Sequence, residues 1–217
     1  MELLLNEARK LGIDLSPEML EKFVIYKNLL VEWNKKFNLT AITDERGIIL
    51  KHFVDSLAAE SFIKYGAAVI DVGSGAGFPG IPLKIARPDI SVTLMDSTIK
   101  KVSFLTEAAG VLGLKKISYV HARAEEAGRS EAFREQFDAA VSRAVAPLDI
   151  LTGYCFPLVK TGGVLLAYKG PGACDEIKKA AGIINKFGGA VDIENVEIDD
   201  MKRVIVAVKK MKKTHTL

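Results

Sequence analysis

The chain has 217 residues, of which 49% are hydrophobic and 26% are charged. Thirty Lys and Arg residues against 27 Asp and Glu residues give a net charge of only +3, which excludes a generally basic nucleic-acid binder. No apolar run reaches the roughly 18 residues of a membrane span, and the amino terminus lacks the basic region of a signal peptide. We therefore expect a cytoplasmic protein with no membrane partner.

Cysteine and histidine usage gives no sign of a metal centre. Cys155 and Cys174 lack the spacing of metal ligands, and an intracellular pair is expected to be reduced. The three histidines, His52, His121 and His215, are scattered along the chain. We therefore predict no bound metal.

Residues 1–62 have a helical pattern. A first helix is expected to stop at Gly12, and Ser16-Pro17-Glu18 has the N-cap, proline and first-turn acid that begin a second helix. A third helical stretch follows between residues 48 and 62. We predict a helical extension over residues 1–62, followed by one α/β domain over residues 63–217.

From residue 67 onward, apolar strands alternate with helical segments, as in a parallel sheet with right-handed crossovers. The expected strands are 67–72, 91–96, 117–121, 138–142 and 163–168, and the expected helices are 79–86, 99–112, 147–159 and 174–187. Two last β-rich runs, 191–198 and 203–208, are too close for a crossover helix and must form an antiparallel hairpin. This Rossmann-like order is usual in methyltransferases and unlike the six-stranded dinucleotide fold.

Residues 67–80 read Ala-Ala-Val-Ile-Asp-Val-Gly-Ser-Gly-Ala-Gly-Phe-Pro-Gly. A short apolar strand ends at Asp71, and Gly73, Gly75 and Gly77 let the backbone turn and approach a ligand closely. Pro79 suits the first turn of a helix. Strand, glycine loop and helix together predict a small-molecule site at the carboxyl end of the sheet.

Two cofactor patterns overlap in this loop. Gly75 to Gly80 fits the dinucleotide pattern G-x-G-x-x-G, whereas Asp71 to Gly77 fits the acidic-x-G-x-G-x-G pattern of methyltransferases. A pyrophosphate needs N–H groups and positive charge, but S-adenosyl-L-methionine carries an ammonium and a sulfonium, which an acidic residue suits better. The loop favours S-adenosyl-L-methionine, with an NAD-dependent oxidoreductase as the alternative.

Asp96 ends the next predicted strand. A carboxylate there can accept both ribose hydroxyls of an adenosine, a role common to both cofactors. The alternative for Asp96 is an N-cap of the helix that begins near Ile99.

The chain resembles the glucose-inhibited division protein B family, also called ribosomal RNA small-subunit methyltransferase G. The resemblance is carried by Trp33–Thr40, His52–Leu57, Asp71–Pro82, Asp96-Ser97 with Lys100-Lys101, Ser142–Ala144 and Lys169-Gly170. It implies that S-adenosyl-L-methionine donates a methyl group to guanine N7 in the 530 loop of 16S rRNA. The implied partner is the small ribosomal subunit or its assembly intermediate, and nothing in the sequence demands more than a monomer.

Carried over to this sequence, the family's cofactor contacts fall on Gly73, Phe78, Asp96, Ser97, Thr98, Ala124, Glu125 and Arg143. The glycine loop itself adds Asp71, Ser74, Gly75 and Gly77. One departure is Lys100-Lys101, where a Lys-Arg pair is common in the family; charge is kept but a bidentate phosphate grip is lost.

The implied chemistry needs no general base, because guanine N7 is a lone-pair acceptor without a proton. The chain agrees, since it lacks the Asn/Asp-Pro-Pro-aromatic motif of exocyclic-amine methyltransferases. Arg143 is the predicted catalytic residue, either ordering the cofactor pocket or neutralising substrate oxygen or phosphate. Its alternative is a structural salt bridge to Asp138 or Asp96.

Other residues have two interpretations each. Phe78 either lines the methyl site or belongs to the core, and His52 with Asp55 is expected to be a packing and hydrogen-bonding pair. The candidate RNA contacts are Lys35, Lys100, Lys101, Arg123, Lys169 and Arg203, with Lys36 and Lys51 as further surface charges. The lysines between residues 209 and 213 either contact phosphates or form a solvated end. A non-enzymatic RNA-binding or assembly factor remains a second alternative.

Overall fold

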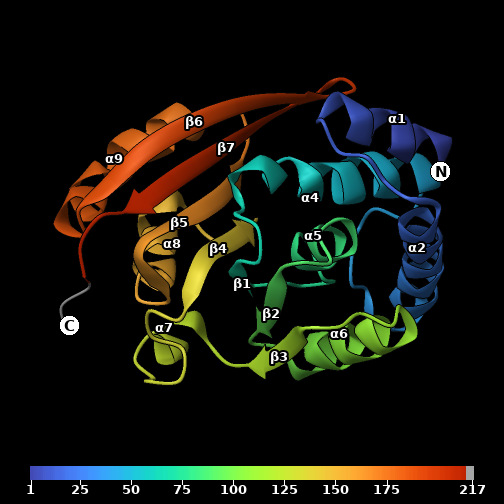
Figure 1. The fold of residues 1–217 in the computed structure, drawn as a ribbon, viewed down its shortest axis with the longest axis horizontal. Coiled ribbons are helices and arrows are strands. Elements are labelled where there is room, and N and C mark those ends of the chain that lie inside the picture. The colour runs from blue at the N-terminus through green and yellow to red at the C-terminus, as the bar shows by residue number, and fades with distance from the viewer. Residues whose placement is uncertain (214–217) are drawn as a thin grey trace.

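The computed structural model describes residues 1–213, which form one seven-stranded sheet in the order β3-β2-β1-β4-β5-β7-β6 (Figure 1). The strands are β1 Ala68–Val72, β2 Ser91–Asp96, β3 Ile117–His121, β4 Phe137–Arg143, β5 Val159–Lys169, β6 Gly189–Ile198 and β7 Met201–Lys210. The first five strands pair in parallel, whereas β7 is antiparallel to both β5 and β6. The predicted mainly parallel sheet with a final hairpin is confirmed.

The longer helices are α1 Glu2–Lys10, α2 Pro17–Phe37, α6 Ile99–Val111, α8 Leu148–Cys155 and α9 Ala173–Lys186. Shorter ones are α3 Glu45–Gly47, α4 Asp55–Leu57, α5 Gly80–Ala86 and α7 Ala124–Ala127. The N-cap of α2 is as predicted, because the Ser16 Oγ accepts a hydrogen bond from the Met19 N–H at 3.2 Å. Asn38 ends α2 in the left-handed conformation, with φ at 47°.

The third helical stretch is not one regular α-helix. It runs from α3 through a π-helical segment, Ile48–Val54, into α4 and a final 3₁₀ turn, Glu60–Phe62. Such widened turns often occur at functional sites. This one carries His52, and its neighbour Asp55 opens α4.

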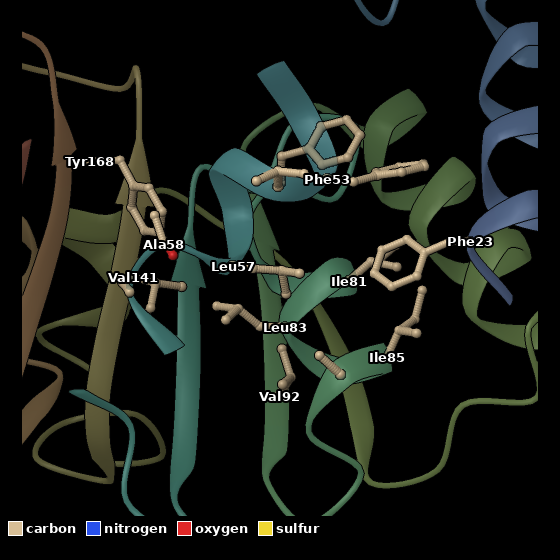
Figure 2. Close-up of a cluster of buried hydrophobic side chains, with 14 of the residues drawn as sticks. Phe23, Phe53, Leu57, Ala58, Ile81, Leu83, Ile85, Val92, Val141 and Tyr168 are labelled. Atoms are coloured by element: carbon tan, nitrogen blue, oxygen red, sulfur yellow. The ribbon is translucent and has the colours of Figure 1, made fainter. Parts of the chain in front are cut away.

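The sheet has helices on both faces. Alternating strand residues such as Val69 and Val141 pack under α1, α2, α5, α6 and the π-helical segment, while Ile70 and Ala140 pack under α8 and α9. Figure 2 shows part of the first core, where Phe23 and Phe53 from the amino-terminal helices lie beside side chains of α5 and the sheet. The helical extension therefore shares one hydrophobic core with the sheet. The predicted boundary at residue 62, between the extension and the α/β domain, stays a prediction.

Several boundaries differ from those expected, most of them by one or two residues. Strand β5 begins at Val159, four residues earlier than predicted, and the register of its pairing with β4 shifts between Phe137 and Ala139. Helix α8 consequently ends at Cys155, before residue 159. The hairpin link is also shorter than expected, since only Asp199 and Asp200 separate β6 from β7.

The lysine-rich end of the chain is not simply solvated. Lys210 is completely buried, and its Nζ donates to the Phe156 and Val159 carbonyls at 2.8 and 2.7 Å and pairs with Glu135 at 2.7 Å. It therefore fastens β7 to the α8–β5 turn, contrary to both predicted roles for it. Lys212 and Lys213 are exposed, and His215 lies outside the described residues.

Candidate methyl-donor site

A cavity of about 490 Å³ opens at the carboxyl ends of β1, β2 and β4. Its walls come from the loops after these strands and after β3, and Leu39, Thr40 and His52 close it from the amino-terminal helices. The sheet order reverses between β1 and β4, so the cavity lies at the topological switch point where ligands bind in open α/β sheets.

The glycine loop is tied to the neighbouring strand by its own backbone. The Gly73 and Ser74 N–H groups both donate to the Met95 carbonyl at 2.9 Å. Gly73 has a φ of +74°, and a Cβ there would lie 2.4 Å from the Val145 Cγ2. Only glycine fits this position, because Val145 closes over it from the end of β4.

Asp96 has the position predicted for it and a partly structural role. Its Oδ2 accepts from the Gly75 N–H and its Oδ1 accepts from the Thr98 N–H, both at 2.9 Å. Thr98, not Asp96, is the N-cap residue of α6. The carboxylate lines the cavity with only 5% of the residue exposed, so contact with a ribose stays a prediction.

Most of the predicted cofactor residues meet at this cavity. Those that line it are Gly73, Ser74, Gly75, Phe78, Asp96, Ser97, Ala124, Glu125 and Arg143. Helix α7, which was not expected from the sequence, carries Ala124 and Glu125. Gly77, Thr98 and Asp71 do not line it.

Asp71 supports the glycine loop from behind. It is fully buried, and its Oδ2 accepts from the Gly80 N–H at 2.8 Å, while its Oδ1 has no hydrogen-bond partner among the described residues. Burial raises the pKa of this carboxyl to about 7. The side chain thus anchors the start of α5. From the sequence it was expected to face the positive charges of the cofactor, and this structural role was not predicted.

Sequence reasoning missed Tyr26. Its hydroxyl, fully buried in α2, donates to the Ala76 carbonyl in the glycine loop. The ring lies 5.5 Å from both the Phe53 and the Phe78 rings. In the sequence Tyr26 has the helical spacing of an ordinary core residue, and only its hydroxyl hinted at a polar partner.

Arg143 ends β4 at the other side of the cavity and is held by its own chain. One guanidinium nitrogen donates to the Asp55 Oδ2 at 2.7 Å and to the Lys51 carbonyl at 2.8 Å. The other nitrogen lies 3.2 Å from the His52 Nδ1, and the guanidinium carbon lies 5.1 Å from the Phe78 ring centre. The salt bridge considered from the sequence exists, but its partner is Asp55.

The Asp55 carboxylate is completely buried between two arginines. Besides Arg143, Arg203 of β7 donates to both Asp55 oxygens. His52 and Asp55 were expected to pair with each other. In the structure each of them contacts Arg143, which lies between them. One buried carboxylate thus joins the first helices, β4 and the final hairpin beside the cavity.

His52 and Phe78 form the cavity wall next to Arg143. Their rings stack with centres 4.4 Å apart, and the His52 Nε2 lies 2.8 Å from the Thr40 Oγ1. Burial, and secondarily the Arg143 charge, lowers the pKa of His52 to about 4. The imidazole is therefore neutral near pH 7. Phe78 combines its two interpretations, since it is buried in the aromatic cluster and also lines the cavity.

The candidate RNA contacts divide into two groups. Lys169 pairs with Glu176 at 2.7 Å and Arg203 with Asp55, so both are engaged inside the protein. Lys35, Lys100, Lys101 and Arg123 lie at the surface or at the cavity rim. A second, open cavity of about 660 Å³ adjoins the first through shared residues that include His52 and Arg143.

The family model described as "GidB: rRNA small subunit methyltransferase G" matches residues 19–197. The chain belongs to this family. Two relatives are both named ribosomal RNA small subunit methyltransferase G. The one from Clostridium botulinum strain Alaska E43 is 48% identical over 97% of this chain and 90% of the relative. The one from Acetivibrio thermocellus is 46% identical over 99% of this chain and 90% of the relative.

Solved structures agree on the fold. A SAM-dependent methyltransferase from Aquifex aeolicus matches with a TM-score of 0.56 and 21% identity over 82% of this chain and 97% of that one. Pyrococcus horikoshii TYW2 in complex with MeSAdo matches with a TM-score of 0.60 and 13% identity over 75% of this chain and 63% of that one. These structures show that the chain has the class I methyltransferase fold. Its membership of the GidB family makes it an rRNA methyltransferase.

Other predictions concern absences. Both cysteines are free, and within residues 1–213 no group of three or more His, Cys, Asp or Glu side chains is arranged to hold a metal. None of the helices in this part of the chain has the length and apolar character needed to span a bilayer.

Proposed function

We propose that this protein transfers a methyl group from S-adenosyl-L-methionine to N7 of a guanine in the 530 loop of 16S rRNA. The observation that carries the proposal is a family match over residues 19–197 that includes every residue lining the cavity. The residues also fit the cofactor. The Gly73 backbone forms a cradle that a Cβ would fill, and Asp96 offers a carboxylate at the end of β2.

When bound, S-adenosyl-L-methionine supplies a methyl group on a positively charged sulfur. Guanine N7 needs no deprotonation before it attacks, so the chain has only to position the base and exclude water. The wall next to Arg143 suits that task. His52, with its pKa lowered to about 4, is only a weak base, and the described side chains there include no carboxylate free to act as a base, because Asp55 is fully paired.

Within this proposal Arg143 is a positioning residue. Its hydrogen bonds to Asp55, Lys51 and His52 fix the guanidinium against the Phe78 ring. This arrangement orders the pocket, the first of the two roles expected for Arg143. We also propose that the enzyme acts as a monomer on small-subunit rRNA.

The test uses purified protein, S-adenosyl-L-methionine with a labelled methyl group, and small subunits from cells that lack this enzyme. Mass spectrometry of 16S rRNA fragments should place the label on one guanine of the 530 loop, as 7-methylguanine. Gly73→Asp should abolish transfer, because the new side chain fills the cradle. Label on another nucleotide would overturn the N7 assignment, and label only on protein would overturn the rRNA assignment.

A further inference from the structure

The carboxyl end of α2 and the amino end of α6 meet beside the mouth of the cavity. Phe37, the last residue of α2, is 40% exposed, and Ile99, the first residue of α6, is 58% exposed. The Lys100 Nζ lies 5.8 Å from the centre of the Phe37 ring. Together with the exposed Lys35 and Lys36, these residues form what we call the Phe37 surface.

Packing explains only one side of the Phe37 ring. Trp33 lies 5.0 Å from it and is itself fixed by Phe104 and by a hydrogen bond to the Glu107 carboxylate. Trp33 thus supports the ring from the protein side. The ring is nonetheless 40% exposed, and the charged end of Lys100 lies over it, where a flat ligand can take its place.

The charges of the Phe37 surface are not all explained by helix stability. Lys35 and Lys36 lie in the last turn of α2, where the helix dipole favours cations. Lys100 lies in the first turn of α6, where the dipole disfavours cations and where no acidic residue is present, whereas the neighbouring Lys101 pairs with Asp96 at 3.6 Å. An anionic partner would relieve this clustering of positive charge on a chain whose net charge is only +3.

The Phe37 surface continues directly into the cavity. Leu39 and Thr40, two and three residues after Phe37, line the cavity, as does Lys101 next to Lys100. A strand that places one base in the cavity therefore brings its neighbouring nucleotides over this surface. Single-stranded RNA matches it chemically, because its bases stack on aromatic rings and its phosphates bind lysine.

We propose that the Phe37 surface binds the substrate RNA next to the methylated nucleotide. An unpaired base stacks on the Phe37 ring in place of the Lys100 ammonium, and Lys35, Lys36 and Lys100 contact the flanking phosphates. This inference rests on the proposed function, because it takes rRNA as the substrate. It assigns the main RNA contact to α2 and α6 and not to Lys169 or Arg203, which are engaged internally.

The first experiment compares Phe37→Ala with Phe37→Tyr, and both with Tyr65→Ala as a matched control. Tyr65 is 89% exposed and precedes β1, at the end of the sheet opposite the cavity. Phe37→Ala should raise the KM for small subunits by about 5- to 100-fold, the range of one lost base stack. Phe37→Tyr and Tyr65→Ala should stay within twofold of the wild type, and cofactor affinity by calorimetry should not change in any variant.

The second experiment replaces Lys35, Lys36 and Lys100 by glutamine and compares this variant with Lys178, Lys179 and Lys186 replaced by glutamine on α9. Both triple variants lose three exposed charges, but only the first changes the Phe37 surface. A plot of the logarithm of the RNA-binding constant against the logarithm of the salt concentration should be less steep by about 2 in the first variant alone. Each single-strand phosphate contact contributes about 0.7 to this slope, and three contacts are lost.

Different outcomes of these experiments distinguish a failure of the proposed Phe37 surface from a failure of the proposed function. If the wild type methylates rRNA and the Phe37 and lysine variants match it within twofold, the Phe37 surface is wrong while the proposed function stands. If the variants fail on intact subunits but bind naked 16S rRNA normally, the surface contacts ribosomal protein and the RNA assignment is overturned. A wild type that transfers no methyl group to any small-subunit RNA overturns both.

Discussion

The two walls of the cavity are built in different ways. The wall from β2 and β3, with Asp96, Ser97 and Ala124, is made of loops in which the Gly75 and Thr98 N–H groups donate to the Asp96 carboxylate, across 21 and 2 positions of the sequence. The wall from β4, with Arg143 and His52, is held by Asp55 and Arg203, which lie 88 and 60 positions from Arg143. Under the proposed function we therefore expect cofactor binding to depend on local loop geometry, and the placement of the base to depend on the assembled tertiary structure.

The largest effect is expected in the local part of the site. Gly73→Ala places a methyl group 2.4 Å from Val145 in a backbone conformation unfavourable for alanine, so cofactor affinity should fall at least about tenfold. Calorimetry with S-adenosyl-L-homocysteine measures this. Gly113→Ala is the matched control, because Gly113 also has a positive φ but has open space around its Cα. Equal affinities for the two variants would show that the cradle is not at Gly73.

Asp55→Ala tests the assembled wall. It leaves Arg143 and Arg203 without their buried carboxylate, and breaking such a pair typically lowers the free energy of unfolding by about 3–5 kcal/mol. Urea denaturation measures the change. Glu18→Ala, which removes the exposed ion pair with Lys22, should leave the unfolding curve unchanged. A loss of less than about 1 kcal/mol for Asp55→Ala would mean that the two arginines hold their positions without it.

These two tests also separate the features that the sequence can predict from those that it cannot. The glycine loop, the carboxylate at Asp96 and the final hairpin are encoded by neighbouring residues, so their patterns were readable before the fold was known. The partner of Arg143 was not, because Asp55 lies 88 residues away in a helix whose π-helical turn has no sequence signature. The burial of Lys210 was missed for the same reason, since its partner Glu135 lies 75 positions away in the sequence.

A third prediction uses two buried groups whose pKa shifts oppose each other. The pKa of His52 is lowered from 6.5 to about 4, so the unfolded chain binds the proton more tightly and His52 makes stability rise between pH 4 and 6.5. The pKa of Asp71 is raised from 3.8 to about 7, so the native state binds the proton more tightly and Asp71 makes stability fall over nearly the same range.

Removing one of the two groups should reveal how the other makes stability change with pH. Relative to the wild type, His52→Gln should lose stability with rising pH, and the change attributable to His52 is at most about 3 kcal/mol. Asp71→Asn should gain stability with rising pH. Thermal unfolding without cofactor at half-unit steps from pH 4 to 8 measures both curves. Parallel curves for the wild type and both variants would contradict the assigned shifts.

The smallest expected effect belongs to the hydrogen bond between Tyr26 of α2 and the glycine loop. Tyr26→Phe keeps the ring against Phe53 and Phe78 but leaves the Ala76 carbonyl of the glycine loop without its buried donor, at a cost of about 1–3 kcal/mol. Because Ala76 lies in the loop and lines the cavity, part of that cost should appear as a several-fold weaker affinity for S-adenosyl-L-homocysteine, with kcat at saturating cofactor nearly unchanged. Tyr65→Phe, at an exposed position, is the control. A variant that loses stability but keeps full cofactor affinity would show that α2 supports the core without positioning the loop.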